Sequence, residues 1–423
     1  MKILVISRNP WDDTNSIGNT LSNFFGGVED VEFAAIYFRS AKPNNKLCKK
    51  YYRTSEIEVA RKWFKPNRIG KSFTLEGGAT VDRESGKNEK KLVRLIHKYG
   101  LKLAYKLSDH LWYSKKWINR NLDAFIEDFA PDLVVTFVKS APQYYLTVKH
   151  LREKYNVPLF TWIADDEYTA LKKKKAQREI DNLEYILKQS AQVTGCSTEI
   201  CEYYNSIFGC EAKPLCKSCD LSTPVKESVN DPLTIVYAGN LLYGRLEIIS
   251  RIAKEINKMA ESGVNVLFEV YSNTELSDQE MQNAFCNSEF TKYMGRRDYD
   301  YIKHRLSEAD IVLHVESFED EEILKTRYSF STKIIDYLQS GSVILAVGPE
   351  QIASMRYISH IPGAKVINSL DCLESDLKSL LSDAPYFSRY ASESREFAEQ
   401  NHSCASAAEK MAKMFNEIVK GGV

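Results

Sequence analysis

The sequence has no excess charge, no long hydrophobic run and no complete cysteine motif for a metal. Its 57 Lys and Arg residues balance 57 Asp and Glu residues. No segment approaches the roughly 18–20 consecutive apolar residues that a membrane-spanning helix needs. The first ten residues lack the apolar segment of a secretory leader, so we expect its nine cysteines to be free thiols in the cytoplasm. Cys210, Cys216 and Cys219 lack the second Cys-x-x-Cys pair of a zinc site.

Signatures of several other enzyme classes are missing as well. There is no Gly-x-Ser-x-Gly turn, and the seven histidines do not cluster, which argues against a Ser-His-Asp hydrolase. No Gly-x-Gly-x-x-Gly follows a predicted strand, which argues against a dehydrogenase. The DYD stretch at 298–300 has the form of a metal-binding acidic pair, but it precedes a predicted helix, and helix capping is the alternative interpretation. We therefore predict no metal and no cofactor.

Strand-like runs alternate with helical patterns along most of the chain, and 43% of residues are hydrophobic, enough for packed cores. This alternation predicts an α/β protein with parallel sheets covered on both faces. We expect two Rossmann-like, doubly wound domains that face each other across a cleft. The predicted strands are residues 2–6, 31–38, 132–138, 158–164, 191–196, 233–239, 264–272, 309–316, 342–348 and 364–368.

The predicted domain boundaries follow from changes in composition. Residues 221–232 are polar, contain two prolines and show no periodicity, so we interpret them as a linker. The first domain then covers 1–220, with a basic helical insertion at about 41–120, and the second covers 233–400. A final helix in 401–423 could cross back to the first domain.

The turn after the first strand of the second domain has features of a phosphate site. Gly239 closes the strand, Gly244 permits close backbone approach, and Arg245 opens the helix. Free backbone amides, a helix dipole and a guanidinium suit a diphosphate. The alternative is a turn that only joins strand to helix.

A second turn, at 331–336, strengthens the phosphate interpretation. Ser331 and Thr332 lie at a predicted helix start, and Lys333 adds a cation where the helix dipole disfavours one unless an anion is bound. Asp336 lies one turn further on, where a carboxylate can accept hydrogen bonds from a ribose diol. The alternative is a surface ion pair between Lys333 and Asp336.

Three segments, AGNLLYGR (238–245), YMGRRDYDYIKHRLSEADIVLHVE (293–316) and SFSTKIIDYLQSGSVILAVG (329–348), resemble the nucleotide-sugar half of GT-B glycosyltransferases, most of all glycosyltransferase family 4. The resemblance implies that the donor diphosphate is bound by Arg245 with Gly239 and Gly244. It places Gly295 and Arg296 beside the nucleobase, Ser331, Thr332 and Lys333 on the phosphates, and Asp336 on the ribose.

The sequence departs from this family at two donor positions. The family often has two glutamates with seven residues between them; the second falls on Asp336 and the first on Tyr328, which has no carboxylate. A family arginine in the first turn corresponds to Asn240. We include both residues in the predicted donor site, because Tyr328 can hydrogen-bond to the sugar or a phosphate.

The first half of the chain contains the candidate acceptor site. Gly18 and Asn19 fall where the family's first loop approaches the acceptor, although a helix cap at Asn15 or Ser16 is an equal alternative. Asp165 and Asp166 directly follow the predicted strand 158–164, at a position where the family often has a His-Asp pair. We expect one of them to orient or deprotonate the acceptor hydroxyl. The alternative is that Asp166 and Glu167 only favour the start of the next helix.

Residues 41–120 contain 21 Lys and Arg against 7 Asp and Glu. Lys90, Lys91, Arg94 and Lys98 surround a leucine stripe, and Trp112, Tyr113 and Trp117 lie nearby. Because no nucleic-acid motif is present, we expect an anionic membrane surface as the partner, with Trp and Tyr as anchors. This places the protein on the inner face of the cell membrane, as a peripheral protein.

Together these features predict a metal-independent, retaining hexosyltransferase that moves a sugar from a UDP- or GDP-sugar to a hydroxyl of a lipid-linked glycan, in polysaccharide or cell-surface glycan biosynthesis. One alternative is a catalytically impaired nucleotide-sugar-binding subunit of a glycan assembly complex. A weaker one is a sugar-nucleotide epimerase.

Overall fold

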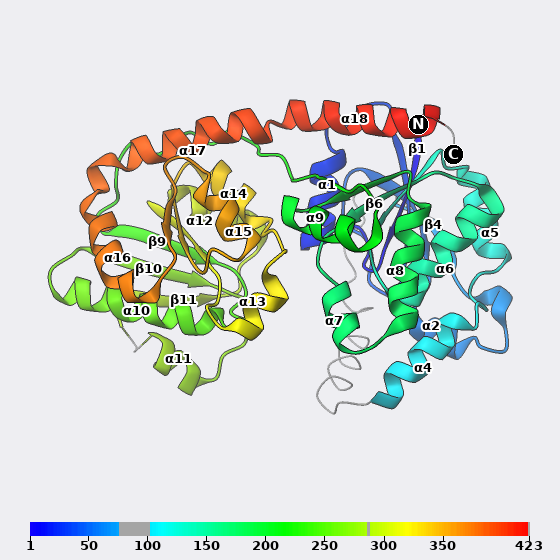
Figure 1. Cartoon of the computed structure of the whole chain (residues 1–423), viewed down its shortest axis with the longest axis horizontal. Coiled ribbons are helices and arrows are strands. Elements are labelled where there is room, and N and C mark those ends of the chain that lie inside the picture. Colours follow the sequence, from blue (N-terminus) through cyan, green and yellow to red (C-terminus); the bar gives the residue numbers. More distant parts are fainter. Residues whose placement is uncertain (76–101, 286–287, 422–423) are drawn as a thin grey trace. The chain divides into compact units, whose positions relative to one another are not determined.

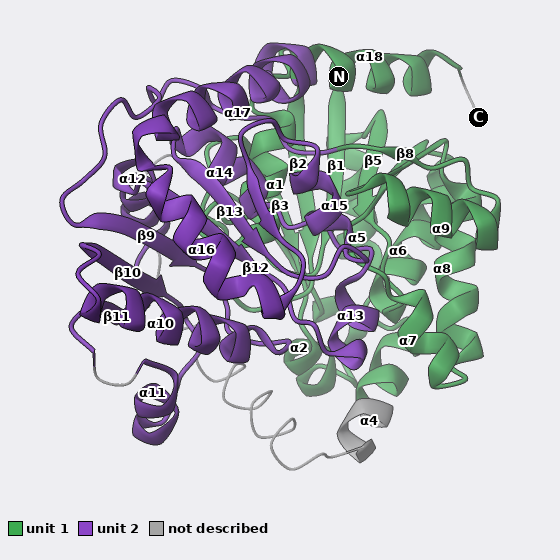
Figure 2. Cartoon of the chain, turned by 60° about the vertical axis from the view of Figure 1, so that its left-hand side comes forward, with its two compact units in different colours: residues 1–215, 408–423 green, residues 216–407 purple. Residues whose placement is uncertain are grey.

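The computed structural model describes residues 1–75, 102–285 and 288–421 and divides the chain into two compact units (Figures 1 and 2). Unit 1 contains residues 1–215 and 408–423, and unit 2 contains residues 216–407. The boundary thus falls at 215/216 rather than 220, and residues 221–232, predicted as a linker, belong to unit 2. The final helix, α18 (Cys404–Gly421), contributes residues to both units.

Unit 1 is built on an eight-stranded sheet in the order β4-β3-β2-β1-β5-β6-β7-β8. All neighbouring strands are parallel except β3 and β4. The strands are β1 (Lys2–Ser7), β2 (Glu32–Tyr37), β3 (Cys48–Arg53), β4 (Lys71–Thr74), β5 (Leu133–Phe137), β6 (Leu159–Ile163), β7 (Gln192–Gly195) and β8 (Lys213–Pro214). The central strands are buried along nearly their whole length, as parallel strands covered on both faces require.

The helices of unit 1 connect and cover these strands. They are α1 (Ser16–Phe25), α2 (Glu56–Arg61), α4 (Lys102–Tyr113), α5 (Arg120–Phe129), α6 (Pro142–His150), α7 (Tyr168–Lys173), α8 (Gln177–Gln189) and α9 (Thr198–Phe208). A short 3-10 turn η1 (Pro66–Arg68) precedes β4, and a π-helical turn η2 (Leu151–Tyr155) extends α6. The end of α18 packs on this unit through Phe415, whose ring contacts Phe25 and Phe160.

The prediction of a helical insertion at 41–120 is wrong in its first part. Residues 48–53 and 71–74 form β3 and β4, which extend the sheet. The predicted membrane anchors Trp112 and Trp117 are buried, at 3% and 0% exposure. Their rings pack edge-on against each other and against Phe38, so they belong to the core and cannot reach a membrane. Lys90, Lys91, Arg94 and Lys98 lie outside the described residues.

Unit 2 is built on a six-stranded parallel sheet in the order β11-β10-β9-β12-β13-β14. Its strands are β9 (Leu233–Ala238), β10 (Val266–Tyr271), β11 (Thr291–Gly295), β12 (Ile311–Val315), β13 (Val343–Val347) and β14 (Lys365–Ile367). Its helices are α10 (Arg245–Glu261), α11 (Asp278–Phe285), α12 (Tyr299–Glu308), α13 (Asp320–Thr326), α14 (Lys333–Ser340), α15 (Ala353–Ser359), α16 (Leu373–Ser382) and α17 (Phe387–His402), with 3-10 turns η3 (Leu370–Cys372) and η4 (Ala384–Tyr386).

Alternate residues of the unit 2 strands build its hydrophobic core. Ile235, Ile311, Leu313 and Leu345 lie in one buried cluster with residues of α10, α11 and α16. Helices α12, α14 and α17 pack on one another in a second layer above the sheet (Figure 1). This three-layer arrangement leaves the carboxyl ends of the strands as the edge where helices begin, which is where ligands bind in such sheets.

Two further features bear on the sequence-based expectations. Within the described residues, no helix combines the length and the apolar character that a membrane crossing demands. The eight cysteines in the described ranges are all free thiols.

Candidate functional site

The turn between β9 and α10 brings four predicted donor residues to one place in unit 2. The β-strand ends at Ala238, one residue before the predicted end at Gly239, and the helix begins at Arg245, as predicted. Tyr243 and Gly244 adopt positive φ angles of 58° and 72°, which turns the chain into the helix. A Cβ on Gly239 would lie 2.4 Å from Lys333 Nζ, and one on Gly244 would lie 2.4 Å from Ser317 Oγ. Only glycine at 239 therefore lets the Lys333 amine approach this turn.

Arg245 lies in this turn, but its charge is already balanced. Its Nη2 donates to both Glu316 carboxylate oxygens at 3.0 and 2.8 Å, its Nη1 donates to Asn240 Oδ1 at 2.9 Å, and its Nε donates to the Val315 carbonyl at 3.1 Å. Burial alone would lower the pKa of Arg245, but Glu316 holds it above the ordinary value. One N–H of Arg245 Nη1 remains for a ligand. Because Glu316 balances the charge of the guanidinium, Arg245 can position a ligand through this hydrogen bond but adds no net positive charge.

Glu316 is the partner that sequence reasoning missed. Its side chain is 3% exposed and also lies 3.3 Å from His314 Nε2. Burial would raise the pKa of Glu316, yet hydrogen bonds and charge from His314 and Arg245 hold it below the ordinary carboxyl value. The only signal in the sequence was an acid at the last position of the predicted strand 309–316, with nothing to indicate its partner 71 residues away.

Lys333 is the cation whose charge remains available. It begins α14 next to Thr332, the residue at the cap position, which makes no side-chain capping bond to the helix. Its Nζ lies 5.9 Å above the Tyr237 ring, and within the described residues it forms no ion pair. In particular the predicted alternative, an ion pair with Asp336, is not formed. Burial and the neighbouring Arg245 charge lower the pKa of Lys333 to about 8.

These features form a site for an anion. An uncapped helix start offers free amide groups, and a lysine without an acidic partner at that position is disfavoured by the helix dipole and by Arg245. An anionic ligand would remove both penalties and restore the ordinary pKa of the amine. The arrangement of Gly239, Arg245 and Lys333 is therefore suited to a phosphate or diphosphate.

Asp336 lies one turn further along α14. Its Oδ1 accepts a hydrogen bond from Tyr299 OH of α12 at 3.1 Å. Burial raises the pKa of Asp336, and the buried Lys217 opposes this effect. Asp336 Oδ2 has no protein donor among the described residues, so this oxygen can accept a hydrogen bond from a ligand hydroxyl.

The remaining predicted donor residues lie in three places in unit 2. Gly295 ends β11, the edge strand, which is separated from β9 by β10, and Arg296 follows it; Gly295 has φ 64° and Arg296 is exposed. Ser331 N donates to Ser354 Oγ at 2.9 Å, which fixes the approach to α14. The Arg327 guanidinium lies over the Tyr328 ring at 4.4 Å. The DYD stretch does cap a helix, because Asp298 Oδ1 accepts from Tyr301 N at 2.8 Å.

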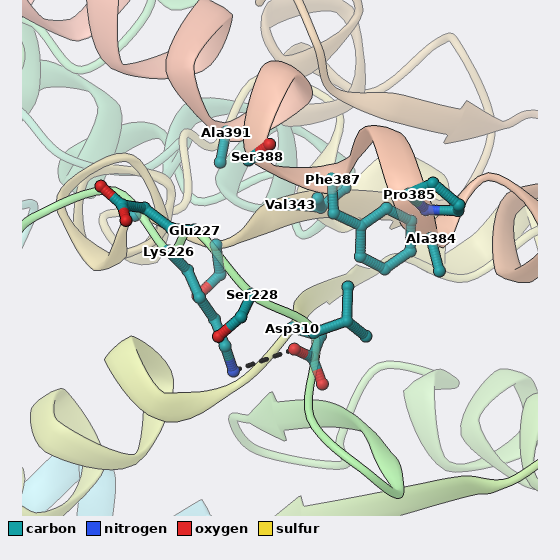
Figure 3. A pocket seen from close by; sticks show the side chains of 13 residues that line it. Lys226, Glu227, Ser228, Asp310, Val343, Ala384, Pro385, Phe387, Ser388 and Ala391 are labelled. Carbon is teal, nitrogen blue, oxygen red and sulfur yellow. Dashed lines mark ion pairs between the residues drawn. The ribbon is translucent and has the colours of Figure 1, made fainter.

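Asp310, part of the motif that suggested the family, has a structural role at the amino ends of the strands, opposite to the carboxyl ends where the candidate donor site lies. Its carboxylate accepts from the backbone N–H of Asn230 and Thr234 at 3.0 and 2.7 Å and pairs with Lys226 at 2.9 Å. Figure 3 shows Lys226 and Asp310 pointing toward each other in a pocket beside Phe387. Because this pocket lies at the amino ends of β12 and β13, it is separate from the candidate donor site.

In unit 1, acidic residues follow β6 as predicted. Asp165 is exposed, and its Oδ2 lies 3.7 Å from Lys139 Nζ, while Glu167 Oε1 lies 2.9 Å from the same amine. Burial alone would lower the pKa of Lys139, but Glu167 and Asp165 hold it above the ordinary value. Asp166 Oδ1 accepts from Thr169 N at 3.2 Å at the start of α7, which is the capping alternative. Asp165 is therefore the acid of this group with the most access to a substrate.

Gly18 and Asn19 lie inside α1. Asn15 caps this helix by accepting from Gly18 N at 2.8 Å, as one of the two interpretations predicted. Gly18 is buried, and a Cβ there would lie 2.1 Å from the Asp12 carbonyl oxygen. Close packing beneath the 12–15 loop thus explains the glycine without a ligand.

Two arginines that sequence reasoning missed lie at the same edge of the unit 1 sheet. Arg8 follows β1, and its carbonyl accepts from Phe38 N at 3.1 Å, which places Arg39 beside it at the end of β2. Partial burial and the positive charge of Arg39 lower the pKa of Arg8. Glu56 and Glu167 partly offset these two like charges at the carboxyl ends of neighbouring strands.

Within residues 1–75, 102–285 and 288–421, no three or more His, Cys, Asp or Glu side chains lie together in a way that could hold a metal ion.

Comparison with known proteins identifies the fold. The chain matches no known family model and no curated protein sequence. It is similar in structure to HepE from Anabaena in complex with UDP and glucose (TM-score 0.65, 11% identity, 99% of this chain and 100% of that chain).

It is also similar to WaaG, a glycosyltransferase involved in lipopolysaccharide biosynthesis (TM-score 0.59, 13% identity, 99% and 100%). A third similar structure is designated a UDP-N-acetylglucosamine 2-epimerase from Listeria monocytogenes (TM-score 0.57, 10% identity, 99% and 97%). These likenesses extend over both units and confirm the predicted α/β architecture: the chain has the GT-B fold.

Proposed function

We propose that the protein is a glycosyltransferase that moves a hexose from a UDP- or GDP-sugar to a hydroxyl group of a glycan. The observation that carries this proposal is Lys333, a half-buried cation without an ion-pair partner among the described residues, at the uncapped start of α14. Asp336 one turn away adds an acceptor for a ribose. HepE, similar in fold, is described in complex with UDP and glucose, which supports the same ligand class here.

The reaction breaks the bond between the sugar C1 and the diphosphate oxygen and forms a bond between C1 and the acceptor oxygen. Lys333 and the amides of α14 stabilise the negative charge that develops on the leaving diphosphate. Arg245, whose charge is balanced by Glu316, orients the diphosphate through its remaining N–H. Because these groups supply the charge, we propose a metal-independent reaction; its retaining outcome rests on the family resemblance alone.

The acceptor side of the proposal rests on unit 1. Asp165 orients the acceptor hydroxyl or takes its proton, because it is the exposed acid at the end of β6. Arg8 and Arg39 at the same edge favour an acceptor that contains phosphate, as lipid-linked glycans do. WaaG acts in lipopolysaccharide biosynthesis, which agrees with an acceptor of this kind. We retain a cytoplasmic location, since free thiols are typical of a reducing compartment.

Calorimetry with UDP and GDP tests the donor site. Replacing Lys333 by Met should weaken binding of the preferred nucleotide by about 1–3 kcal/mol, the scale of a charge-assisted hydrogen bond. Lys325→Met is the matched control, because Lys325 is an exposed lysine of α13 that pairs with Glu322. Equal affinities in the wild type and the Lys333 variant would show that the anion site is elsewhere.

A second candidate function is a nucleotide-sugar-binding subunit without turnover. The neutralised Arg245 and the tyrosine at 328 favour it, because both reduce the charge available for the leaving group. An assay with UDP- or GDP-sugar and a lipid-linked acceptor separates the two, since only a transferase releases nucleoside diphosphate, and release should persist in EDTA. An epimerase would instead convert the nucleotide sugar without any acceptor.

A further inference from the structure

A turn in unit 1 holds an aromatic side chain out in solvent. This turn, here called the Phe64 turn, comprises residues 61–71 and connects the end of α2 to β4. Phe64 is 91% exposed, the highest exposure of any large hydrophobic side chain in the described ranges. Trp63 beside it is only partly covered, and its ring lies 5.8 Å from His110 of α4. A single exposed apolar side chain is common at a protein surface, so the informative feature is that two aromatic side chains, Trp63 and Phe64, are both accessible in one turn.

Hydrogen bonds from neighbouring side chains fix the backbone of the turn, and this backbone conformation directs Phe64 into solvent. Asn119 Nδ2 donates to the carbonyls of Pro66 and Ile69 at 2.8 and 2.9 Å, and Asn121 Nδ2 donates to the Asn67 carbonyl at 2.8 Å. Lys62 Nζ reaches Glu58 Oε1 and the Arg68 carbonyl, both at 2.6 Å. A turn with this many anchors cannot fold Phe64 back into the core without breaking them.

Cations surround the exposed ring. The turn contains five basic residues and no acidic one, and four of the basic side chains are exposed: Arg61, Lys65, Arg68 and Lys71. Lys116 approaches from the neighbouring segment, with its Nζ 3.9 Å from the Trp63 ring and 6.0 Å from the Phe64 ring. Among the described residues, Glu58 of α2 contacts this turn through Gly70 N, and its carboxylate is already paired with Lys62. The surface is therefore an apolar tip within a positive ring.

We propose that the Phe64 turn is a contact site for an anionic lipid surface, with Phe64 and Trp63 entering the interface and the basic ring binding lipid phosphates. The basic residues favour a partner with negative charge. The outward Phe64 favours a partner that also has an apolar layer, and a membrane has one whereas a soluble polyanion does not. The proposal concerns unit 1 only and does not depend on nucleotide binding by unit 2. It also replaces Trp112 and Trp117, which are buried, as the membrane-contacting aromatics.

The tryptophan distribution provides a direct readout. The chain has five tryptophans, and Trp11, Trp112, Trp117 and Trp162 are at most 6% exposed. Trp63 is the one that brominated lipids can quench, because quenching needs contact with the lipid chains. Full-length protein mixed with vesicles of phosphatidylcholine and phosphatidylglycerol in equal parts should show quenching at low salt. The effect should be lost with phosphatidylcholine alone and in the Trp63→Phe variant.

Flotation with the same vesicles measures the contribution of each group. Phe64→Ser should reduce the vesicle-bound fraction about tenfold, the effect of removing one partly buried aromatic. Tyr386→Ser is the matched control, because Tyr386 is 56% exposed but belongs to unit 2, and its flotation should equal that of the wild type. The double variant Arg61→Glu, Lys65→Glu should not float, whereas Lys254→Glu, Lys378→Glu in unit 2 should float normally.

Three outcomes would overturn the proposal. The first is no flotation of the wild type at low salt, and the second is equal flotation of Phe64→Ser and Tyr386→Ser. The third is binding to a single-stranded oligonucleotide together with no quenching by brominated lipid, which would assign the turn to a soluble polyanion. Calorimetry with UDP and GDP should be unchanged in every variant, which separates this test from that of the donor site.

Discussion

At the carboxyl ends of the strands, the two sheets leave side chains of opposite charge available to a ligand. In unit 2, Arg245 and Glu316 form a pair with side chains only 14% and 3% exposed, and Lys333 beside them has no such partner. In unit 1, Lys139 is shared by Asp165 and Glu167 at 3.7 and 2.9 Å, with exposures of 22% to 63%. Unit 2 thus keeps a cation available in a rigid, desolvated setting, and unit 1 keeps a carboxylate available at its surface.

This contrast fits the two halves of a transfer reaction. A leaving diphosphate needs fixed positive charge in a place with little water, where electrostatic stabilisation is strongest. An acceptor hydroxyl needs an accessible base or hydrogen-bond acceptor instead. The comparison predicts that replacing the accessible acid of unit 1 alters turnover alone, whereas replacing charged residues of unit 2 also alters stability and nucleotide affinity.

The largest expected effect is on turnover, from Asp165. Replacing Asp165 by Asn should lower kcat about a hundred- to ten-thousand-fold, the range for loss of a general base, with little change in nucleotide affinity. Asp166→Asn is the control, because its Oδ1 can still accept from Thr169 N and cap α7. Steady-state transfer kinetics with each variant test this. If Asp166→Asn proved the more damaging change, the roles of the two acids would be reversed.

The next effect is on stability, from Glu316. Its replacement by Ala leaves Arg245 buried without a counter-charge and should destabilise unit 2 by about 3–5 kcal/mol. Glu167→Ala in unit 1 should cost only about 1 kcal/mol, because that ion pair is closer to solvent. Urea unfolding can follow the units separately, since all five tryptophans lie in unit 1.

For Glu316→Ala, the circular dichroism transition should move to lower urea, while the tryptophan fluorescence transition should stay in place. A wild-type circular dichroism curve for this variant would mean that Arg245 finds another partner.

A smaller effect, about tenfold per pH unit, is expected in nucleotide binding above pH 8. In the free protein Lys333 loses its proton near its pKa of about 8. A bound diphosphate favours the charged amine and raises that pKa toward the ordinary value, so binding takes up a proton in this range. Affinity for UDP or GDP should therefore be constant below pH 8 and fall above it. In Lys333→Met the calorimetric affinity should be constant over the same pH interval. If the variant instead lost affinity above pH 8 as the wild type does, the proton would belong to another group.

Local signals in the sequence were sufficient for parts of this site. Arg245 and Lys333 were predicted at helix starts because a glycine-containing turn and a hydroxyl-rich turn precede them, and the helices begin at these residues. The pairing of Arg245 with Glu316 was not predictable, since it depends on which strands are neighbours, and β9 and β12 are far apart in the sequence.

The same limit explains the errors in residues 41–120. The short strand β4 pairs with β3 and lacks a strong apolar pattern, so its basic composition suggested a helical surface instead. Trp112 and Trp117 are surrounded by lysines in the sequence, but their rings are placed in the core by contacts with Phe38, which comes some 70 residues earlier. Long-range packing of this kind leaves no mark on local composition.

The smallest expected effect concerns the sugar of the nucleotide and separates a ligand role of Asp336 from a structural one. Asp336→Asn keeps an oxygen that can accept from Tyr299 OH, so the α12 contact should survive. It removes the charged acceptor for a ribose hydroxyl, so affinity for UDP or GDP should fall by about 1 kcal/mol, one hydrogen bond. Affinity for the 2′-deoxy analogue should fall less, because part of the interaction is already missing there. Tyr299→Phe is the second control: if it reproduced the whole effect of Asp336→Asn on both nucleotides, Asp336 would act only by positioning α12 against α14.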